Sequence, residues 1–309
     1  MSKQKSASLP ETPAGRFLRE YKKTQNTSEE LISDLKIAIE NESPELQSFL
    51  ICGSETDLHQ VLKTVRIQGY KNLQRLQLMQ IDMTSKSSKA LRDYFDTRLY
   101  PLKHLEIIDL ISIDSLRNLP LESLQIRFQT SLMSEHRIFW NCLSSIRTLT
   151  ELSLVYSRLT PDSCILLANE LKNFKHLTKL DLEGNPILSV GAGILMTEEI
   201  NLTYWGFRNC QIDRYCETND KLVHDFIQHI CKQVVYNPFL ETIDLRDNFL
   251  NSSDYTEILK ANTQLGDFKP CKILICERNC NSETFLTLSG LSKTSKRSKG
   301  KGKGKKKKS

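Results

Sequence analysis

The sequence predicts an α/β solenoid, in which short parallel strands alternate with helices and each unit packs on the next. Three features support this fold class. An apolar register recurs eight times along the chain, segments with helical periodicity follow several copies, and all but one of the intervals between copies can hold a helix. At 309 residues the chain is long enough to bury a large core in such a fold.

The register is clearest in the stretch LTKLDLEGNPI, residues 177–187, where apolar residues and an asparagine take fixed places. Three other copies are also clear and four are weaker. The eight copies start at Leu73, Leu105, Leu121, Leu149, Leu177, Leu202, Leu240 and Cys271. A unit of this kind exposes an apolar face on its own and buries it only by stacking on its neighbours.

The pattern L-x-x-L-x-L-x-x-[NC]-x-[LI] resembles that of the leucine-rich repeat family, and the longer intervals are similar to those of its ribonuclease-inhibitor-like subclass. The resemblance implies a horseshoe with an inner parallel sheet and outer helices. It also implies that Asn185 and Asn248 turn inward and satisfy backbone groups where the chain bends, and Cys210 takes the same place in its copy. The 16 residues between Leu105 and Leu121 cannot hold both a strand and a helix, so we expect a missing helix there.

The first part of the chain precedes the repeats. Residues 1–26 are polar and contain proline, so we expect them to be mostly disordered. Residues 27–65 are expected to form a helical N-terminal cap, with Thr27 and Glu30 as a capping box before the first helix. The repeat domain is then expected to cover residues 66–291.

Two helices between copies can be predicted in detail. Thr160 is expected to cap a helix that has Pro161 at its first position. Its predicted buried face consists of Ile165, Leu167, Ala168, Leu171 and Phe174. The second helix, in the stretch NDKLVHDFIQHICKQVV, is expected to bury Leu222, Val223, Phe226, Ile227, Ile230 and Val234.

Strand alternation separates core positions from positions that point away from the core. The predicted protein-binding face consists of nine of the outward positions that carry charged or aromatic side chains. They are Arg127, Glu151, Lys179, Asp181, Glu183, Tyr204, Arg208, Asp244 and Arg246. Such a mixture fits a protein-binding face better than an active site, and a merely solvated face is the alternative. The same register assigns Asp109 and Ile275 to the column that contains Asp181.

Residues 292–309 are rich in lysine and glycine and are expected to form a disordered tail. The predicted polyanion-binding residues are Lys293, Lys296, Arg297, Lys299, Lys301, Lys303, Lys305, Lys306, Lys307 and Lys308. Three roles remain open: a nuclear-import signal, a clamp on nucleic acid, and a clamp on an acidic protein surface such as tubulin tails. The tail contains no aromatic residue to stack on bases, which counts against sequence-specific nucleic-acid binding.

The sequence does not predict a calcium loop, a disulfide framework or a catalytic site. Asp181, Glu183 and Asn185 match the start of a calcium loop, but the position that should supply a bidentate glutamate is Ala192. The nine cysteines are odd in number and irregularly spaced, so they are expected to be free thiols without a metal. Two of them, Cys271 and Cys276, are expected in the core. No catalytic motif occurs, so we expect no enzyme activity, no metal and no cofactor.

The functional expectation is therefore a scaffold that holds a protein partner of unknown identity on its concave face. Similar small repeat proteins are architectural parts of the cilium, its axoneme and the cytoskeleton. One alternative is a regulator of a small GTPase like the Ran GTPase-activating proteins, although these usually carry an acidic tail. Another is a nuclear or ribosome-associated factor that binds nucleic acid through the tail. Without an apolar run of membrane-spanning length or a secretion signal, we expect a cytoplasmic protein with no membrane contact, the nucleus being the alternative.

Overall fold

The computed structural model describes most of the chain. It covers residues 12–24, 26–40, 46–53, 56–71, 73–81, 85–96, 102–108, 116–128, 137–197, 200–213, 220–264 and 270–291. The tail 292–309, with all of its predicted polyanion-binding residues, lies outside the described residues.

Nine parallel strands form one continuous sheet whose strand order follows the sequence. They are β1 (Ser48–Cys52), β2 (Arg75–Met79), β3 (His104–Ile108), β4 (Ser123–Arg127), β5 (Glu151–Val155), β6 (Lys179–Asp181), β7 (Tyr204–Gly206), β8 (Thr242–Asp244) and β9 (Lys272–Leu274). Each strand therefore pairs with the strands next to it in the chain, as expected for a solenoid-like arrangement.

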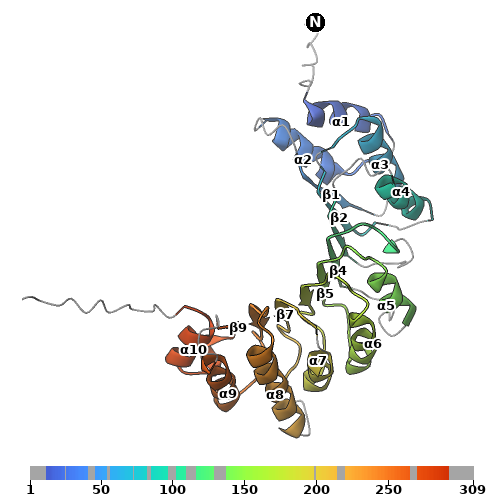
Figure 1. Ribbon diagram of the computed structural model, residues 1–309. Helices are drawn as coiled ribbons and strands as arrows, with labels where there is room; N and C mark the ends of the chain where they lie inside the picture. Colours follow the sequence, from blue (N-terminus) through green and yellow to red (C-terminus); the bar gives the residue numbers. More distant parts are fainter. Residues whose placement is uncertain are drawn as a thin grey trace, which may run out of the picture.

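Helices connect most of the strands. In the described part of the chain they are α1 (Pro13–Tyr21), α2 (Glu29–Glu40), α3 (Leu58–Ile67), α4 (Ser85–Asp96), α5 (Arg137–Ser144), α6 (Pro161–Leu171), α7 (Leu188–Thr197), α8 (Asp220–Tyr236), α9 (Ser252–Thr263) and α10 (Ser282–Leu288). Successive helices from α5 to α9 pack on one another. Figure 1 shows a curved molecule with the strands along its inner side and these helices along its outer side. Among the described helices, none has the length and apolar character needed to cross a bilayer.

The core lies between the sheet and the outer helices. Strand β4 shows the alternation that produces it, because Leu124 and Ile126 are buried whereas the residues on either side of them face the other way. Trp140 on α5 and Trp205 on β7 are among the largest fully buried side chains. Buried side chains connect from α1 to α10 without a break, so the described units share one apolar core.

An aromatic cluster closes the N-terminal end of this core. Phe17 of α1 packs against Phe49 of β1 at a ring distance of 5.2 Å and against Tyr70 at 5.7 Å. Helix α1 lies within residues 1–26, where polar composition predicts mostly disorder. Three apolar residues at helical spacing, Phe17, Leu18 and Tyr21, are enough to fix it on the cap.

The segment 27–65 contains strand β1 in addition to helices α2 and α3. The stretch LQSFLIC, from Leu46 to Cys52, is a further copy of the register that the sequence pattern did not reveal, with Phe49 and Ile51 in its core positions. The predicted cap of α2 is wrong by one residue. The hydroxyl of Ser28, not that of Thr27, accepts a hydrogen bond from the backbone N–H of Leu31 at 3.3 Å.

The two helices predicted in detail are confirmed as α6 and α8, although Leu222 of α8 is only partly buried. Thr160 caps α6, since its hydroxyl accepts a hydrogen bond from the N–H of Ser163, and Pro161 begins the helix. Ile165 was wrongly assigned to the buried face and is 46% exposed. Helix α6 instead buries Cys164, Leu167, Ala168 and Leu171, so Ile165 lies beside the buried stripe.

The register prediction is wrong for two strands. In β3, Leu105 pairs with Leu76, so Glu106 rather than Asp109 shares the column of Asp181. Asp109 itself lies outside the described residues. Leucine and isoleucine are so dense in LKHLEIIDL that two registers satisfy the apolar pattern, and pairing with β2 and β4 selects one of them.

In β9 the shift is one residue. Ile273 pairs with Ile243 of β8, so Leu274 rather than Ile275 takes the outward column. This register buries both Ile273 and Ile275, whereas Cys276 is only partly buried and Cys271 is buried. The prediction that Cys276 lies in the core is therefore wrong. Between β3 and β4 the described residues 116–122 contain no α-helix, in agreement with the short interval there.

Candidate protein-binding face

Helices α5 to α9 lie along the outer side of the sheet (Figure 1), and we call the opposite side of the sheet the inner face. Two columns of outward side chains cross it from strand to strand. The first column is Ser48, Arg75, His104, Ser123, Glu151, Lys179, Tyr204, Thr242 and Lys272. The second column is Leu50, Gln77, Glu106, Gln125, Ser153, Asp181, Gly206, Asp244 and Leu274.

All nine predicted face residues lie on the inner face or at its edge. Glu151, Lys179, Asp181, Tyr204 and Asp244 belong to the two columns, and Arg127 ends β4. The other three, Glu183, Arg208 and Arg246, follow strands that end after three residues, so they lie in the turns beyond the strand ends.

Buried amides fix these turns. The side-chain oxygen of Asn185 accepts hydrogen bonds from the N–H groups of Ser157 and Leu159 at 2.8 and 3.1 Å. Its nitrogen donates to the carbonyl groups of Leu154 and Leu182 at 2.6 and 2.7 Å. The amide therefore joins its own turn to the preceding one, as predicted, and satisfies backbone groups that no water reaches.

Asn248 repeats this arrangement two copies later. Its oxygen accepts from the N–H groups of Cys210 and Ile212 at 3.0 and 3.1 Å, and its nitrogen donates to the carbonyl of Phe207 at 2.6 Å. In the copy between them the thiol of Cys210 donates to the carbonyl of Leu182 at 3.1 Å. Burial raises the pKa of the Cys210 thiol, so it stays protonated and serves as a donor.

An ion cluster centred on Glu106 lies at the N-terminal side of the inner face. Glu106 is 8% exposed and accepts from the guanidinium groups of Arg127 and Arg75 at 3.0 and 3.4 Å. The amide nitrogen of Gln77 donates to the same carboxylate at 2.8 Å. Sequence reasoning missed Glu106, because the shifted register for β3 placed it among the inward positions.

A second pair joins neighbouring strands in the middle of the face. Lys179 of β6 contacts Glu151 of β5 at 2.5 Å, and both side chains are about half exposed. Such exposed pairs contribute little to stability, typically about 0–1 kcal/mol. The pair nevertheless fixes both charges directly across adjacent strands.

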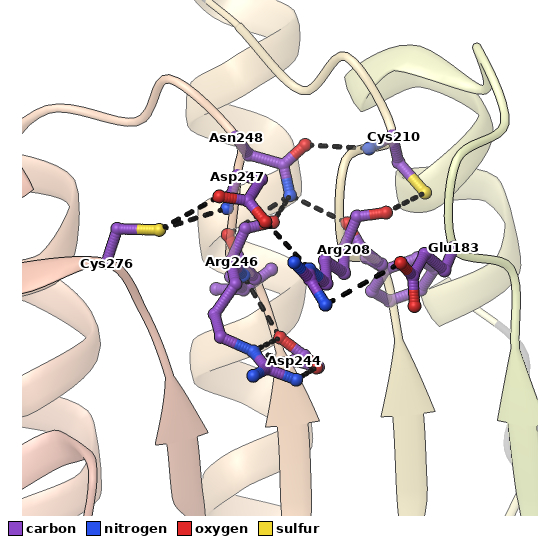
Figure 2. A network of polar contacts seen from close by, with 10 residues as sticks. Glu183, Arg208, Cys210, Asp244, Arg246, Asp247, Asn248 and Cys276 are labelled. Carbon is purple, nitrogen blue, oxygen red and sulfur yellow. Dashed lines mark hydrogen bonds and ion pairs between the residues drawn. The ribbon is translucent and has the colours of Figure 1, made fainter.

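A third network lies where β7, β8 and β9 end (Figure 2). Asp244 is 2% exposed and accepts from the guanidinium group of Arg246 at 2.6 and 2.9 Å and from its backbone N–H at 3.1 Å. Arg208 lies between two carboxylates, at 2.7 Å from Asp247 and 3.7 Å from Glu183. The hydrogen bond from Arg208 lowers the pKa of Asp247, so this carboxylate stays charged at neutral pH.

Asp181 differs from the other acids of the face. Its Oδ1 accepts a hydrogen bond from the N–H of Glu183 at 3.1 Å, and within the described ranges it forms no ion pair. Gly206 gives it space, because a Cβ atom at position 206 would lie 2.3 Å from Oδ1. Burial raises the pKa of Asp181, and the nearby carboxylates of Glu183 and Asp244 add to this effect.

A hollow of about 490 Å³ opens on the inner face between the ion cluster and Asp181. Ser123 on β4 and Ser153 on β5 are the shortest side chains that line it. Longer side chains, from Arg75 at one end to Asp181 and Tyr204 at the other, surround it. The combination of a hollow with fixed charges and an aromatic residue at its border suits contact with another protein chain.

Two exposed aromatic residues form a pair just beyond the ends of β4 and β5. Phe128 and Tyr156 stack at a ring distance of 5.5 Å and are 51% and 39% exposed. Both adopt positive φ, and the ring of Tyr156 lies so close to Gly184 that a Cβ atom there would be 2.3 Å from it. Sequence reasoning missed this pair; aromatic residues directly before the asparagine place of two successive copies were the available signal.

The geometry also bears on the alternative chemistries. Asn185 directs its oxygen to the N–H groups of Ser157 and Leu159, away from a loop that could collect calcium with Asp181. No group of three or more His, Cys, Asp or Glu side chains is placed to hold a metal within the part of the chain that the structure describes. The eight cysteines in that part are free thiols, as predicted, and Cys216 lies outside it.

No model of a known protein family matches the sequence of this chain, and a search of curated proteins finds no match either. The inner face is therefore interpreted from its own geometry.

Proposed function

We propose that the chain is a non-catalytic scaffold of the leucine-rich repeat kind, ribonuclease-inhibitor-like in its alternation of strand and helix. Two observations support this family proposal. The apolar register marks the buried positions of most strands, and buried amides at the place of Asn185 and Asn248 bind the backbone of neighbouring turns. A curved parallel sheet with helices on one side follows from stacking such units.

In this proposal a protein partner binds on the inner face. The observation that carries it is the inner face of the nine-stranded sheet, where side chains of both charges and an aromatic residue surround a hollow. Ion pairs hold several of these side chains in place before binding, including Glu106 with Arg127 and Asp244 with Arg246. Binding to fixed side chains loses less conformational entropy than binding to mobile ones, which favours affinity.

The basic tail provides a second contact in this proposal. Its lysines would bind an acidic surface such as tubulin tails, and linkage to the inner face would raise the overall affinity without any new contact. The combination of a protein-binding inner face with a basic tail favours a role as a cytoplasmic scaffold of the cilium or cytoskeleton. The proposal for the tail rests on its charge, because the tail lies outside the described residues.

Photo-cross-linking from a defined position tests the binding face. A photoreactive phenylalanine analogue replaces Tyr204 on the inner face in one variant and Tyr236 on α8 in the control. Both positions hold tyrosine, and Tyr236 is 76% exposed, so the control is the more accessible of the two. We expect a discrete cross-linked protein from position 204 in cells and none from position 236. Cross-links from position 236 alone would contradict the proposed face.

A further inference from the structure

The carboxylates of the inner face divide into paired ones and a single unpaired one. In the described part of the chain, Glu106, Glu151, Glu183, Asp244 and Asp247 each have an arginine or lysine nitrogen within 3.7 Å. Asp181 has no such partner there, although it lies in the same column as Glu106 and Asp244. Arg127, which is bound to Glu106, has only the weakest of the influences on the pKa of Asp181.

The surroundings of Asp181 leave its carboxylate accessible from the hollow. Its two neighbours in the second column have the shortest side chains of that column, Ser153 on β5 and Gly206 on β7. Asp181 and Ser153 both line the hollow, and the Oγ atom of Ser153 is buried without a hydrogen-bond partner. Only one oxygen of Asp181 is used within the described part of the protein, by the N–H of Glu183.

The charges that act on Asp181 are mainly negative. Two further carboxylates, Glu183 and Asp244, act on Asp181 and raise its pKa in addition to the larger effect of burial. A cation that entered the hollow would relieve this repulsion and would lie in surroundings less polar than water, where charge pairs are stronger. The aromatic ring of Tyr204, which also lines the hollow, offers a surface for the aliphatic part of a long cationic side chain.

We propose that Asp181 is the docking point for a lysine or arginine side chain of the partner protein, which enters the hollow between β5 and β7. A single cationic side chain fits better than a metal ion, because no cluster of three ligating side chains exists in the described residues. The inference rests on the proposed function, since it specifies the chemistry of one residue of the partner. It assigns to Asp181 a specificity role that the paired carboxylates around it do not share.

Peptide selection provides the test. Random twelve-residue peptides displayed on phage are selected on the full chain, and the enriched peptides are measured against two variants. Asp181→Asn keeps the size of the side chain and the acceptor for the N–H of Glu183 but removes the charge. The control is Asp225→Asn, which removes an exposed carboxylate on the outer helix α8. Thermal unfolding followed by circular dichroism verifies that both variants fold.

We expect the enriched peptides to share one lysine or arginine and to bind the Asp181→Asn variant about tenfold more weakly, or weaker still. Their affinity for the Asp225→Asn variant should change by less than about twofold. Replacing the shared cation by alanine should weaken binding to the original chain but add little further loss on the Asp181→Asn variant, as a direct pairing requires.

The outcomes separate the inference from the proposed function. One contrary outcome is that the peptides bind the Glu151→Lys variant more weakly but the Asp181→Asn variant with unchanged affinity. That result would overturn the cation site and leave the inner face as the binding surface. Selection that yields no shared cation would also overturn the site. The proposed function itself is decided by the cross-links from position 204, which do not depend on the charge of Asp181.

Discussion

At the scale of single residues, the buried polar side chains of this protein hold the fold, and the exposed ones define its surface. Asn185 makes four strong contacts with the backbone of two turns and has no exposed surface. Asp181 lies four residues before it, and only one of its carboxylate oxygens accepts a hydrogen bond within the described part of the protein. Polar residues that lie close together in one short stretch of sequence therefore have different physical roles.

Replacing Asn185 by alanine should destabilise the fold strongly. The substitution leaves the N–H groups of Ser157 and Leu159 and the carbonyl of Leu154 buried without partners, which should cost roughly 3 kcal/mol or more. The exposed Asn201 serves as the control, and Asn201→Ala should change the free energy of unfolding by less than about 0.5 kcal/mol. Urea unfolding followed by circular dichroism measures both. Equal effects of the two substitutions would contradict the structural role of Asn185.

Gly206 should not tolerate a methyl group. A Cβ atom there would lie 2.3 Å from Oδ1 of Asp181 and 3.0 Å from its Cα, so Gly206→Ala should destabilise by about 1–3 kcal/mol. At Gly193, in helix α7, an added Cβ atom would meet only one atom within 4 Å, a carbon of His229 at 3.8 Å. Gly193→Ala should therefore stabilise the protein by about 0.5–1 kcal/mol. Changes in melting temperature of opposite sign are the expected result.

The ionisation of Asp181 should lower stability at neutral pH. Burial raises the pKa of this carboxyl in the folded state, so its charged form is less favourable there than in the unfolded chain. This loss of stability is absent below the pKa of Asp181 in the unfolded chain, about 3.9. It grows as the pH rises through the higher pKa that Asp181 has in the folded state. Asp181→Asn should therefore raise the melting temperature at pH 7, and the gain should vanish near pH 4. A gain that is constant with pH would exclude ionisation as its cause.

Asp247 should behave in the opposite way. The hydrogen bond from Arg208 lowers its pKa, so its contribution is present above the unfolded pKa and is lost as the pH falls through the folded value. Asp247→Asn should therefore lower the melting temperature at pH 7 and have less effect in acid. Asparagine suits this position, where φ is +59°, because it tolerates the left-handed region. The two variants measured over the same pH range are controls for each other.

At the scale of elements, several helices begin where a side chain replaces the missing backbone partners of the first turn. Thr160 and Ser163 form a reciprocal cap at the start of α6, and Asn251 and Asp254 do the same for α9. These signals are local, which explains why the sequence predicted the start of α6 correctly. Ser28 and Thr27 illustrate the limit, because two adjacent residues could both cap and only the structure shows which one does.

Removal of the α9 cap should have a measurable effect on its own. Asn251→Ala removes the acceptor for the N–H of Asp254 and should destabilise the protein by about 1 kcal/mol. Asn251→Ser, which keeps a capping oxygen, should restore most of the stability. Guanidinium unfolding of the three proteins compares them directly. If serine were no better than alanine, the hydrogen bond would not be the source of the effect.

The strands show the same limit of local signals. For β5, β6, β7 and β8 the apolar register identified the strand and its buried side correctly. For β3 and β9 the sequence offers two overlapping registers, because apolar residues also fill the intermediate places. Hydrogen bonding to neighbouring strands decides between them, and no single strand contains that information. Glu106 was missed for this reason.

At the scale of the whole molecule, the sheet presents its inner face on the side opposite the outer helices, and the basic tail is proposed to add a second contact. The tail carries ten basic residues between positions 293 and 308 and no acidic residue. The remainder of the chain, without the two basic ends, has more acidic than basic residues. A contact made by the tail should therefore depend on charge alone.

Salt should weaken the tail contact steeply. We expect the full chain to bind a polyglutamate peptide at about 50 mM salt and to lose most of that binding at about 300 mM, where charges are screened over a few ångströms. Deletion of residues 292–309 should abolish polyglutamate binding and leave the melting temperature unchanged. Fluorescence anisotropy of a labelled peptide measures the binding. Undiminished binding by the shortened chain would show that another surface binds the acidic peptide.

The sequence by itself determined the α/β class, the repeated strand and helix units, the inward asparagines and most of the charged residues of the inner face. Each of these depends on periodicity or on contacts within one unit, which a local pattern records. Only the tertiary structure decided the strand registers of β3 and β9, the ion pairs, the stacked Phe128 and Tyr156, and the isolation of Asp181 among the described residues. These features depend on side chains from different units that meet across the sheet, so their distances are set by stacking and not by spacing along the chain.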